Sequence, residues 1–150
     1  MKIEVTQQKS VRAVALTKKT TMANLAAAIG EGYGKIGAYL AKSGVQMSDA
    51  PYVAYPGDMH NEFDLEMGFP VASDLPCEGE FYMTDTYEGK AVSATFKGPY
   101  SELSKAYGEV FKYIGENKLE MTGGCYDFYT NDPADTPPEE LLTIIVIPIK

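Results

Sequence analysis

The chain has 150 residues, of which 45% are hydrophobic and 23% are charged, a composition typical of one globular domain and unlike that of a disordered, collagenous or coiled-coil protein. Its 21 acidic residues outnumber the 13 basic ones, and the net charge of −8 disfavours nucleic acid and membrane surfaces as direct partners. The sequence has no apolar run of membrane-spanning length and no signal-peptide layout at its start, which predicts a cytoplasmic protein.

Residues suited to metal or cofactor chemistry are scarce. Two cysteines, Cys77 and Cys125, and one histidine, His60, are too few for a zinc site or a disulfide framework. No phosphate-binding loop, dinucleotide fingerprint or nucleophile elbow is present. We therefore expect no metal and no cofactor, with reduced cysteines and with His60 solvated in a polar loop.

The first half of the chain shows four strand patterns and one helix pattern. Residues 2–8 and 11–17 are rich in β-branched types and are broken near Lys9-Ser10, so we expect a hairpin. A helical stripe then runs from Met22 to Leu40 and stops at Lys42-Ser43-Gly44. The segments 51–56 and 63–71 favour two further strands.

The second half repeats the first. Residues 13–37 and 91–115 are identical at ten of 25 aligned positions, and the blocks at 51–58 and 69–71 also recur, at 125–132 and 147–149. The repeated elements are a hairpin over 79–87 and 90–97, a helix starting after Gly98-Pro99, and strands over 124–130 and 141–149. We therefore predict one domain, residues 1–150, made of two modules, about 1–74 and 75–150.

The predicted fold is α+β. Two helices are too few to cover both faces of about eight strands, so we expect one mostly antiparallel sheet with both helices on one face. A pseudo-two-fold axis would pass between the two strand-strand-helix-strand-strand modules and leave a groove there. Junctions of this kind are common ligand sites.

Aromatic residues are the first candidates for lining that groove. The chain has 11 tyrosines and no tryptophan. Tyr33, Tyr107 and Phe111 lie on the helical stripes, while Tyr55 and Tyr129 occupy matching strand positions. Their rings can stack on flat ligands and attract cations. The alternative is that each ring simply packs in the core.

Acidic residues are the second candidates. Strand alternation places Asp127 on one face with Cys125 and Tyr129, and its repeat partner is the apolar Val53. Glu66 likewise has an apolar repeat partner, although a solvated strand face also accounts for it. A buried carboxylate needs a partner or a purpose. It either pairs with a cationic ligand or has a raised pKa and acts as an acid or base.

Four motifs resemble the GyrI-like family of small-molecule-binding domains, also found as effector-binding domains of AraC-type and MerR-type multidrug regulators. The motifs are FKGPYSEL at 96–103, YDFYTNDP at 126–133, TPPEELLT at 136–143 and DLEMGFPV at 64–71. The resemblance implies a duplicated fold that binds bulky, lipophilic, often cationic aromatic compounds between its halves. Tyrosines line such pockets, and the pocket acid corresponds to Asp127. The family often has a second acid after the Leu-Leu-Thr segment, where this chain has Ile144 instead. The corresponding acid of the first half is kept, as Glu66.

Our leading hypothesis is a stand-alone binding protein for a lipophilic, cationic aromatic small molecule, since residue 1 already begins the first strand and leaves no room for a DNA-binding segment. Its ligand-binding residues would be Asp127, Glu66, Tyr33, Tyr55, Tyr107, Tyr129 and Phe111. One alternative, implied by the resemblance, is a hydrolase of cyclopropane-bearing genotoxins with Asp127 as general base. Another is a protein inhibitor of DNA gyrase that uses the acidic surface. A protein partner or a homodimer stays open.

Overall fold

The computed structural model describes residues 1–56, 61–131 and 135–150, so His60 lies outside the described residues. The elements in chain order are β1 (Ile3–Gln8), β2 (Arg12–Thr20), α1 (Leu25–Ser43), β3 (Tyr52–Tyr55), β4 (Phe63–Pro70), β5 (Tyr82–Asp85), β6 (Gly89–Lys97), α2 (Leu103–Glu116), β7 (Cys125–Tyr129) and β8 (Leu142–Pro148). A short 3-10 turn precedes each α-helix, and a third precedes β8.

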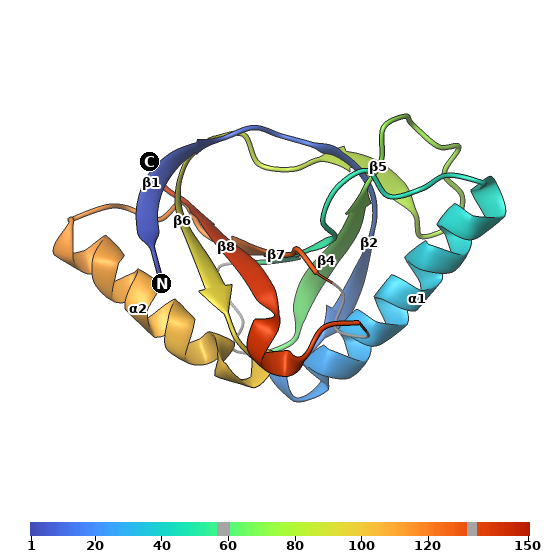
Figure 1. The fold of residues 1–150 in the computed structure, drawn as a ribbon. Coiled ribbons are helices and arrows are strands. Elements are labelled where there is room, and N and C mark those ends of the chain that lie inside the picture. Colours follow the sequence, from blue (N-terminus) through green and yellow to red (C-terminus); the bar gives the residue numbers. More distant parts are fainter. Residues whose placement is uncertain (57–60, 132–134) are drawn as a thin grey trace.

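The strands form one antiparallel sheet in the order β1-β6-β8-β7-β3-β4-β2-β5. Both helices cover the same face of this strongly curved sheet, and their N-terminal ends converge near its middle (Figure 1). The prediction of an α+β fold with two helices on one face is therefore confirmed.

Each helix has its own core. The stripe Ala28, Ile36 and Leu40 of α1 packs with residues of β2 and β4, and the stripe Ala106, Val110 and Ile114 of α2 packs with residues of β6 and β8. As predicted, α1 ends at Gly44, which has a left-handed backbone with φ of 69°, a conformation that glycine adopts at little cost. The repeat in the sequence is thus a repeat in the packing.

The two halves meet at the pair β3 and β7. Val53 lies directly opposite Asp127 in this pair, and these two residues are also repeat partners. The pseudo-two-fold axis therefore passes between them. Asp127 is placed at the centre of the sheet, between the two helix-covered cores.

The predicted hairpins are wrong. β1 pairs with β6, not with β2, and β5 pairs with β2, not with β6. The two modules thus exchange their first strands. The sequence pattern predicts two short strands on either side of a turn. It does not predict which strands they pair with, because the same backbone groups can form hydrogen bonds with a strand of either module.

The exchange forces two connections to cross the face of the sheet that lies away from the helices (Figure 1). We call residues 8–11 and 86–88 the crossing segments. They hold each other, since the Val11 amide donates to Thr86 Oγ1 over 2.9 Å and the Thr86 amide donates to the Val11 carbonyl over 3.0 Å. Thr86 is only 6% exposed. The concave face is therefore covered along its middle by two linked segments.

Candidate functional site

Asp127 is a buried acid on the helix-covered face. It is 2% exposed, and the Tyr107 hydroxyl donates a hydrogen bond to its Oδ1. The hydroxyls of Tyr55 and Tyr129 also hydrogen-bond to this carboxylate. Three phenols, one from α2 and two from the neighbouring strands, therefore surround one carboxylate.

Further rings complete what we call the tyrosine cluster, namely Tyr33, Tyr55, Tyr100, Tyr107 and Tyr129 around Asp127. The Tyr129 ring lies 5.2 Å from the Tyr100 ring and 6.4 Å from the Tyr33 ring, and Tyr33 meets the Phe69 ring edge-on at 5.2 Å. Edge-to-face contacts at these separations are favourable for aromatic pairs. The cluster joins α1, α2, β3 and β7.

Burial dominates the acid-base properties of the cluster. It raises the pKa of Asp127 to about 6, although hydrogen bonds from Tyr107, Tyr55 and Tyr129 oppose the shift. Burial also raises the pKa of the Cys125 thiol to about 11 and raises that of Tyr107 strongly. At neutral pH the cluster therefore holds one carboxylate among neutral hydroxyls and a neutral thiol.

No ion pair in the described part of the chain includes Asp127. Nearby, the buried hydroxyls of Tyr33 and Thr143 have no hydrogen-bond partner within the described residues. Thr143 is fully buried and lies opposite Tyr129 on the next strand. The site thus offers a carboxylate without a basic partner, and two hydroxyls without a hydrogen-bond partner, among the described residues.

The structure brings five of the seven predicted ligand-binding residues close together but separates Glu66. Tyr33, Tyr55, Tyr107, Tyr129 and Asp127 share the cluster. Glu66 pairs with Ala54, beside Tyr126, and so lies on the concave face. There it accepts hydrogen bonds from the hydroxyls of Tyr52 at 2.8 Å and Tyr82 at 3.0 Å.

Phe111 has a marginal position, and Tyr100 a central one. The Phe111 side chain is 47% exposed and contacts the cluster through the Tyr107 ring at 5.9 Å. Tyr100 is absent from the predicted ligand-binding residues, although it lies in the FKGPYSEL motif at 96–103. Its place in that motif could have identified it.

Two further properties bear on the class of site. The described residues contain no group of three or more histidine, cysteine and acidic side chains that could hold a metal ion. Neither helix of the described fold combines the length and apolar character that crossing a membrane requires. What the arrangement offers is a buried carboxylate enclosed by tyrosine rings between the two helices.

A family model of the GyrI-like small molecule binding domain matches residues 1–150. The chain therefore belongs to the GyrI-like family, and the resemblance drawn from its four motifs is confirmed. A comparison with curated proteins finds no match.

Solved structures share the fold. The EcmrR C-terminal domain has a TM-score of 0.78 at 19% identity, covering 100% of this chain and 99% of that chain. In an EcmrR-DNA complex the TM-score is 0.82 at 18% identity, covering 99% of this chain, which spans only 57% of the EcmrR chain. The structure of SAV2435 bound to tetraphenylphosphonium has a TM-score of 0.66 at 14% identity, covering 100% of this chain and 94% of that chain. A hydrolase from Listeria innocua has a TM-score of 0.66 at 15% identity, covering 99% of this chain and 92% of that chain. At these identities the likeness establishes the fold alone.

Proposed function

Starting from its membership of the GyrI-like family, we propose that this protein binds lipophilic aromatic cations in the tyrosine cluster, with Asp127 as the counter-charge. The observation that carries the proposal is a carboxylate that is 2% exposed and held by phenol hydroxyls, without a basic partner among the described residues. Hydroxyl groups donate hydrogen bonds to such a charge but do not neutralise it. A bound cation beside the carboxylate would neutralise the charge.

The rings supply the remaining recognition. Tyrosine faces attract cations and bury apolar surface at the same time. Since the rings of Tyr33, Tyr100 and Tyr129 lie against one another, a bulky ligand must displace some of them. The measured affinity then includes the cost of opening the cluster. It equals the affinity of the open form multiplied by the fraction of molecules that are open.

The geometry supports binding more than hydrolysis. A general base must reach a water molecule or a substrate proton. Three tyrosine hydroxyls already bond to the Asp127 carboxylate, and its side chain is buried among rings. Stoichiometric binding without turnover is what such an enclosed carboxylate, hydrogen-bonded to tyrosine hydroxyls, favours.

A fluorescence titration with rhodamine 6G, a planar cation, tests the proposal beside neutral and anionic dyes of similar shape. We expect saturable binding of the cation and an affinity at least about tenfold lower in Asp127→Asn, which corresponds to about 1.4 kcal/mol. Asp64→Asn is the matched control, because Asp64 is an exposed strand acid. Binding that ignores dye charge, or equal losses in both variants, would contradict the assignment of Asp127. Chemical conversion of the dye would favour the alternative hypothesis of a hydrolase.

A further inference from the structure

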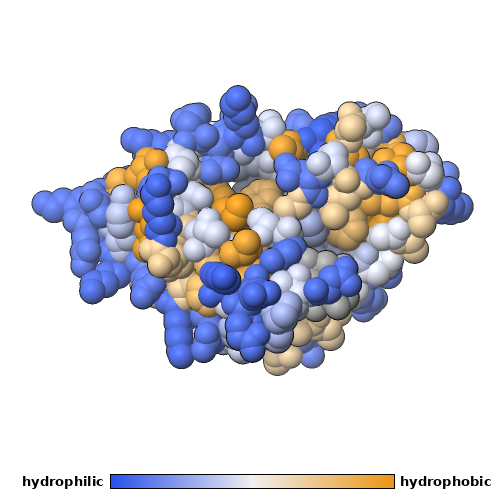
Figure 2. Space-filling model, viewed as in Figure 1, coloured by the Kyte–Doolittle hydropathy of each residue, from blue (hydrophilic) through white to orange (hydrophobic). Residues whose placement is uncertain are grey.

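A cavity lies on the concave face, on the other side of the sheet from Asp127. Its volume is about 220 Å³, and Figure 2 shows a hollow near the middle of the molecule with hydrophobic atoms in its wall and hydrophilic atoms around it. Tyr126, Phe128, Ile144 and Val146 of β7 and β8 form its floor, and the crossing segments cover it. The cavity therefore exists because the modules exchange their first strands.

A break in the repeat shapes the floor. In the first half, Tyr52 lies opposite Gly68, and its ring occupies the space that a side chain at Gly68 would need. In the second half, Tyr126 lies opposite Val146. The Tyr126 ring stacks with that of Phe128, with centroids 5.9 Å apart and planes 17° apart. Two nearly parallel aromatic rings thus line the floor of the cavity.

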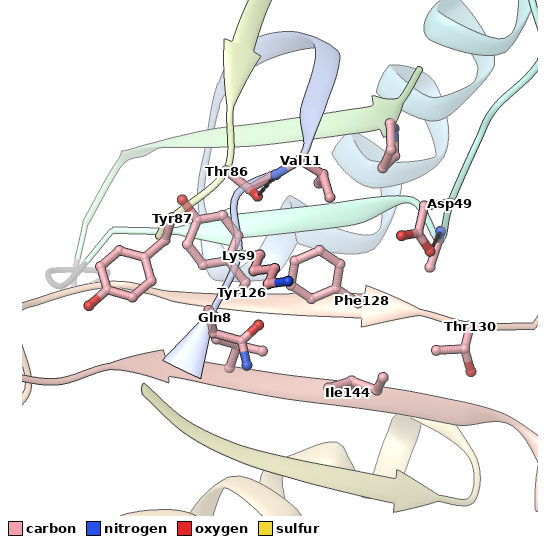
Figure 3. Close-up of a pocket in the computed structure, with 13 residues that line it drawn as sticks. Gln8, Lys9, Val11, Asp49, Thr86, Tyr87, Tyr126, Phe128, Thr130 and Ile144 are labelled. Carbon is pink, nitrogen blue, oxygen red and sulfur yellow. Dashed lines mark hydrogen bonds between the residues drawn. The ribbon is translucent and has the colours of Figure 1, made fainter. Parts of the chain in front are cut away.

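Charge is divided between two ends of the cavity. Figure 3 shows the Lys9 side chain reaching from its crossing segment toward the Phe128 ring, while Asp49 stands at another side of the cavity, near Thr130. Lys9 takes part in no ion pair of the described chain. Asp49 accepts a hydrogen bond from the Ala50 amide over 2.8 Å. An anionic group would be attracted by Lys9 and repelled by Asp49.

We propose that this cavity is a second small-molecule site, which takes a flat aromatic carboxylate with its ring on Tyr126 and Phe128 and its carboxylate on Lys9. The cavity is smaller than the roughly 300–1,000 Å³ of sites for drug-sized ligands, so a two-ring compound suits it. Its charge preference is opposite to that of the tyrosine cluster. The inference does not depend on the function proposed for that cluster.

The experiment is an NMR titration of the 15N-labelled protein with 2-naphthoate, beside the neutral 2-naphthalenemethanol. We expect the naphthoate to shift the amide signals of Thr86, Tyr126 and Phe128 and to bind more tightly than the alcohol. Lys9→Met should weaken naphthoate binding about tenfold, because a charge-assisted contact is lost. Lys112→Met, an exposed lysine of α2, is the matched control and should leave the affinity unchanged.

A second variant keeps the test independent of Lys9. Ile144→Phe adds volume to the cavity floor and should abolish naphthoate binding while leaving rhodamine 6G binding at the tyrosine cluster intact. The proposal is overturned if the naphthoate does not bind, if the alcohol binds equally well, or if Lys9→Met and Lys112→Met behave alike. Failure of the cation site would appear separately, in the titration of Asp127→Asn.

Discussion

The Asp127→Asn variant should gain stability relative to the unsubstituted protein as pH rises, by about 2–3 kcal/mol between pH 4 and pH 7.5. The cause is the pKa of the Asp127 carboxyl, which burial raises from 3.8 to about 6. The folded state therefore holds this proton more tightly than the unfolded state does. Asparagine has no proton to lose.

The sign follows from proton counts. Between pH of about 4 and 6 the folded protein binds more protons at this site than the unfolded chain, so its stability falls as pH rises. By about pH 7, one unit above the folded-state pKa, the penalty is nearly complete, because the carboxylate is then largely ionised in both states. The ionised, buried Asp127 is thus a standing cost to the fold at neutral pH, which is what a site kept for a cationic ligand requires.

Urea unfolding of both proteins at several pH values measures this difference. The linear extrapolation gives a free energy of unfolding at each pH, and subtraction removes the contribution of the other titrating groups. Asp64→Asn serves again as the exposed control. A constant difference for Asp127→Asn would mean that the carboxyl titrates as it does in the unfolded chain.

Alanine at position 68 should destabilise the protein by about 3 kcal/mol, within the range of overpacked cores that also lose a charged hydrogen bond. A Cβ there would lie 2.4 Å from the ring of Tyr52. That ring is fully buried and donates its hydroxyl to Glu66 over 2.8 Å. It also packs against Tyr126 and Phe128, so it has little room to move aside.

Gly34→Ala is the matched control, because a Cβ at Gly34 in α1 would meet nothing within 4 Å. That change should stabilise the protein by up to about 1 kcal/mol through helix propensity. A double-mutant cycle isolates the clash, since Gly68→Ala should cost little in a Tyr52→Ala background. Thermal or urea unfolding measures the four proteins of the cycle and the Gly34→Ala control. A loss for Gly68→Ala that persists in that background would show that Tyr52 is not the cause.

Much of the fold could be predicted because the repeat consists of local sequence patterns. The helical stripes and the stop at Gly44 depend on residues within a few positions of one another. The exchange of β1 and β5 depends on partners far apart in the chain. No pattern around Lys9 or Thr86 distinguishes a hairpin from a segment that crosses the sheet, and this is where the prediction failed.

The same distinction applies to the site. Strand alternation placed Asp127 with Tyr129, and the structure agrees. Whether Glu66 joins them depends on how β4, β3 and β7 align, and that register puts Glu66 beside Tyr126 on the opposite face. Only the three-dimensional pairing could show that the two acids belong to different surfaces, and that a cavity lies over Tyr126 and Phe128.

The most direct test of the central claim is the affinity for tetraphenylphosphonium measured by isothermal titration calorimetry from pH 5 to pH 8. If ionised Asp127 is the counter-charge, the affinity should be constant above pH of about 6 and should fall toward tenfold per pH unit below it. The neighbouring Tyr55, Tyr107, Tyr129 and Cys125 stay neutral throughout this range, because burial raises the pKa of each. In Asp127→Asn the affinity should be weaker and independent of pH. A pH-independent affinity in the unsubstituted protein, or the same slope in the variant, would contradict the account.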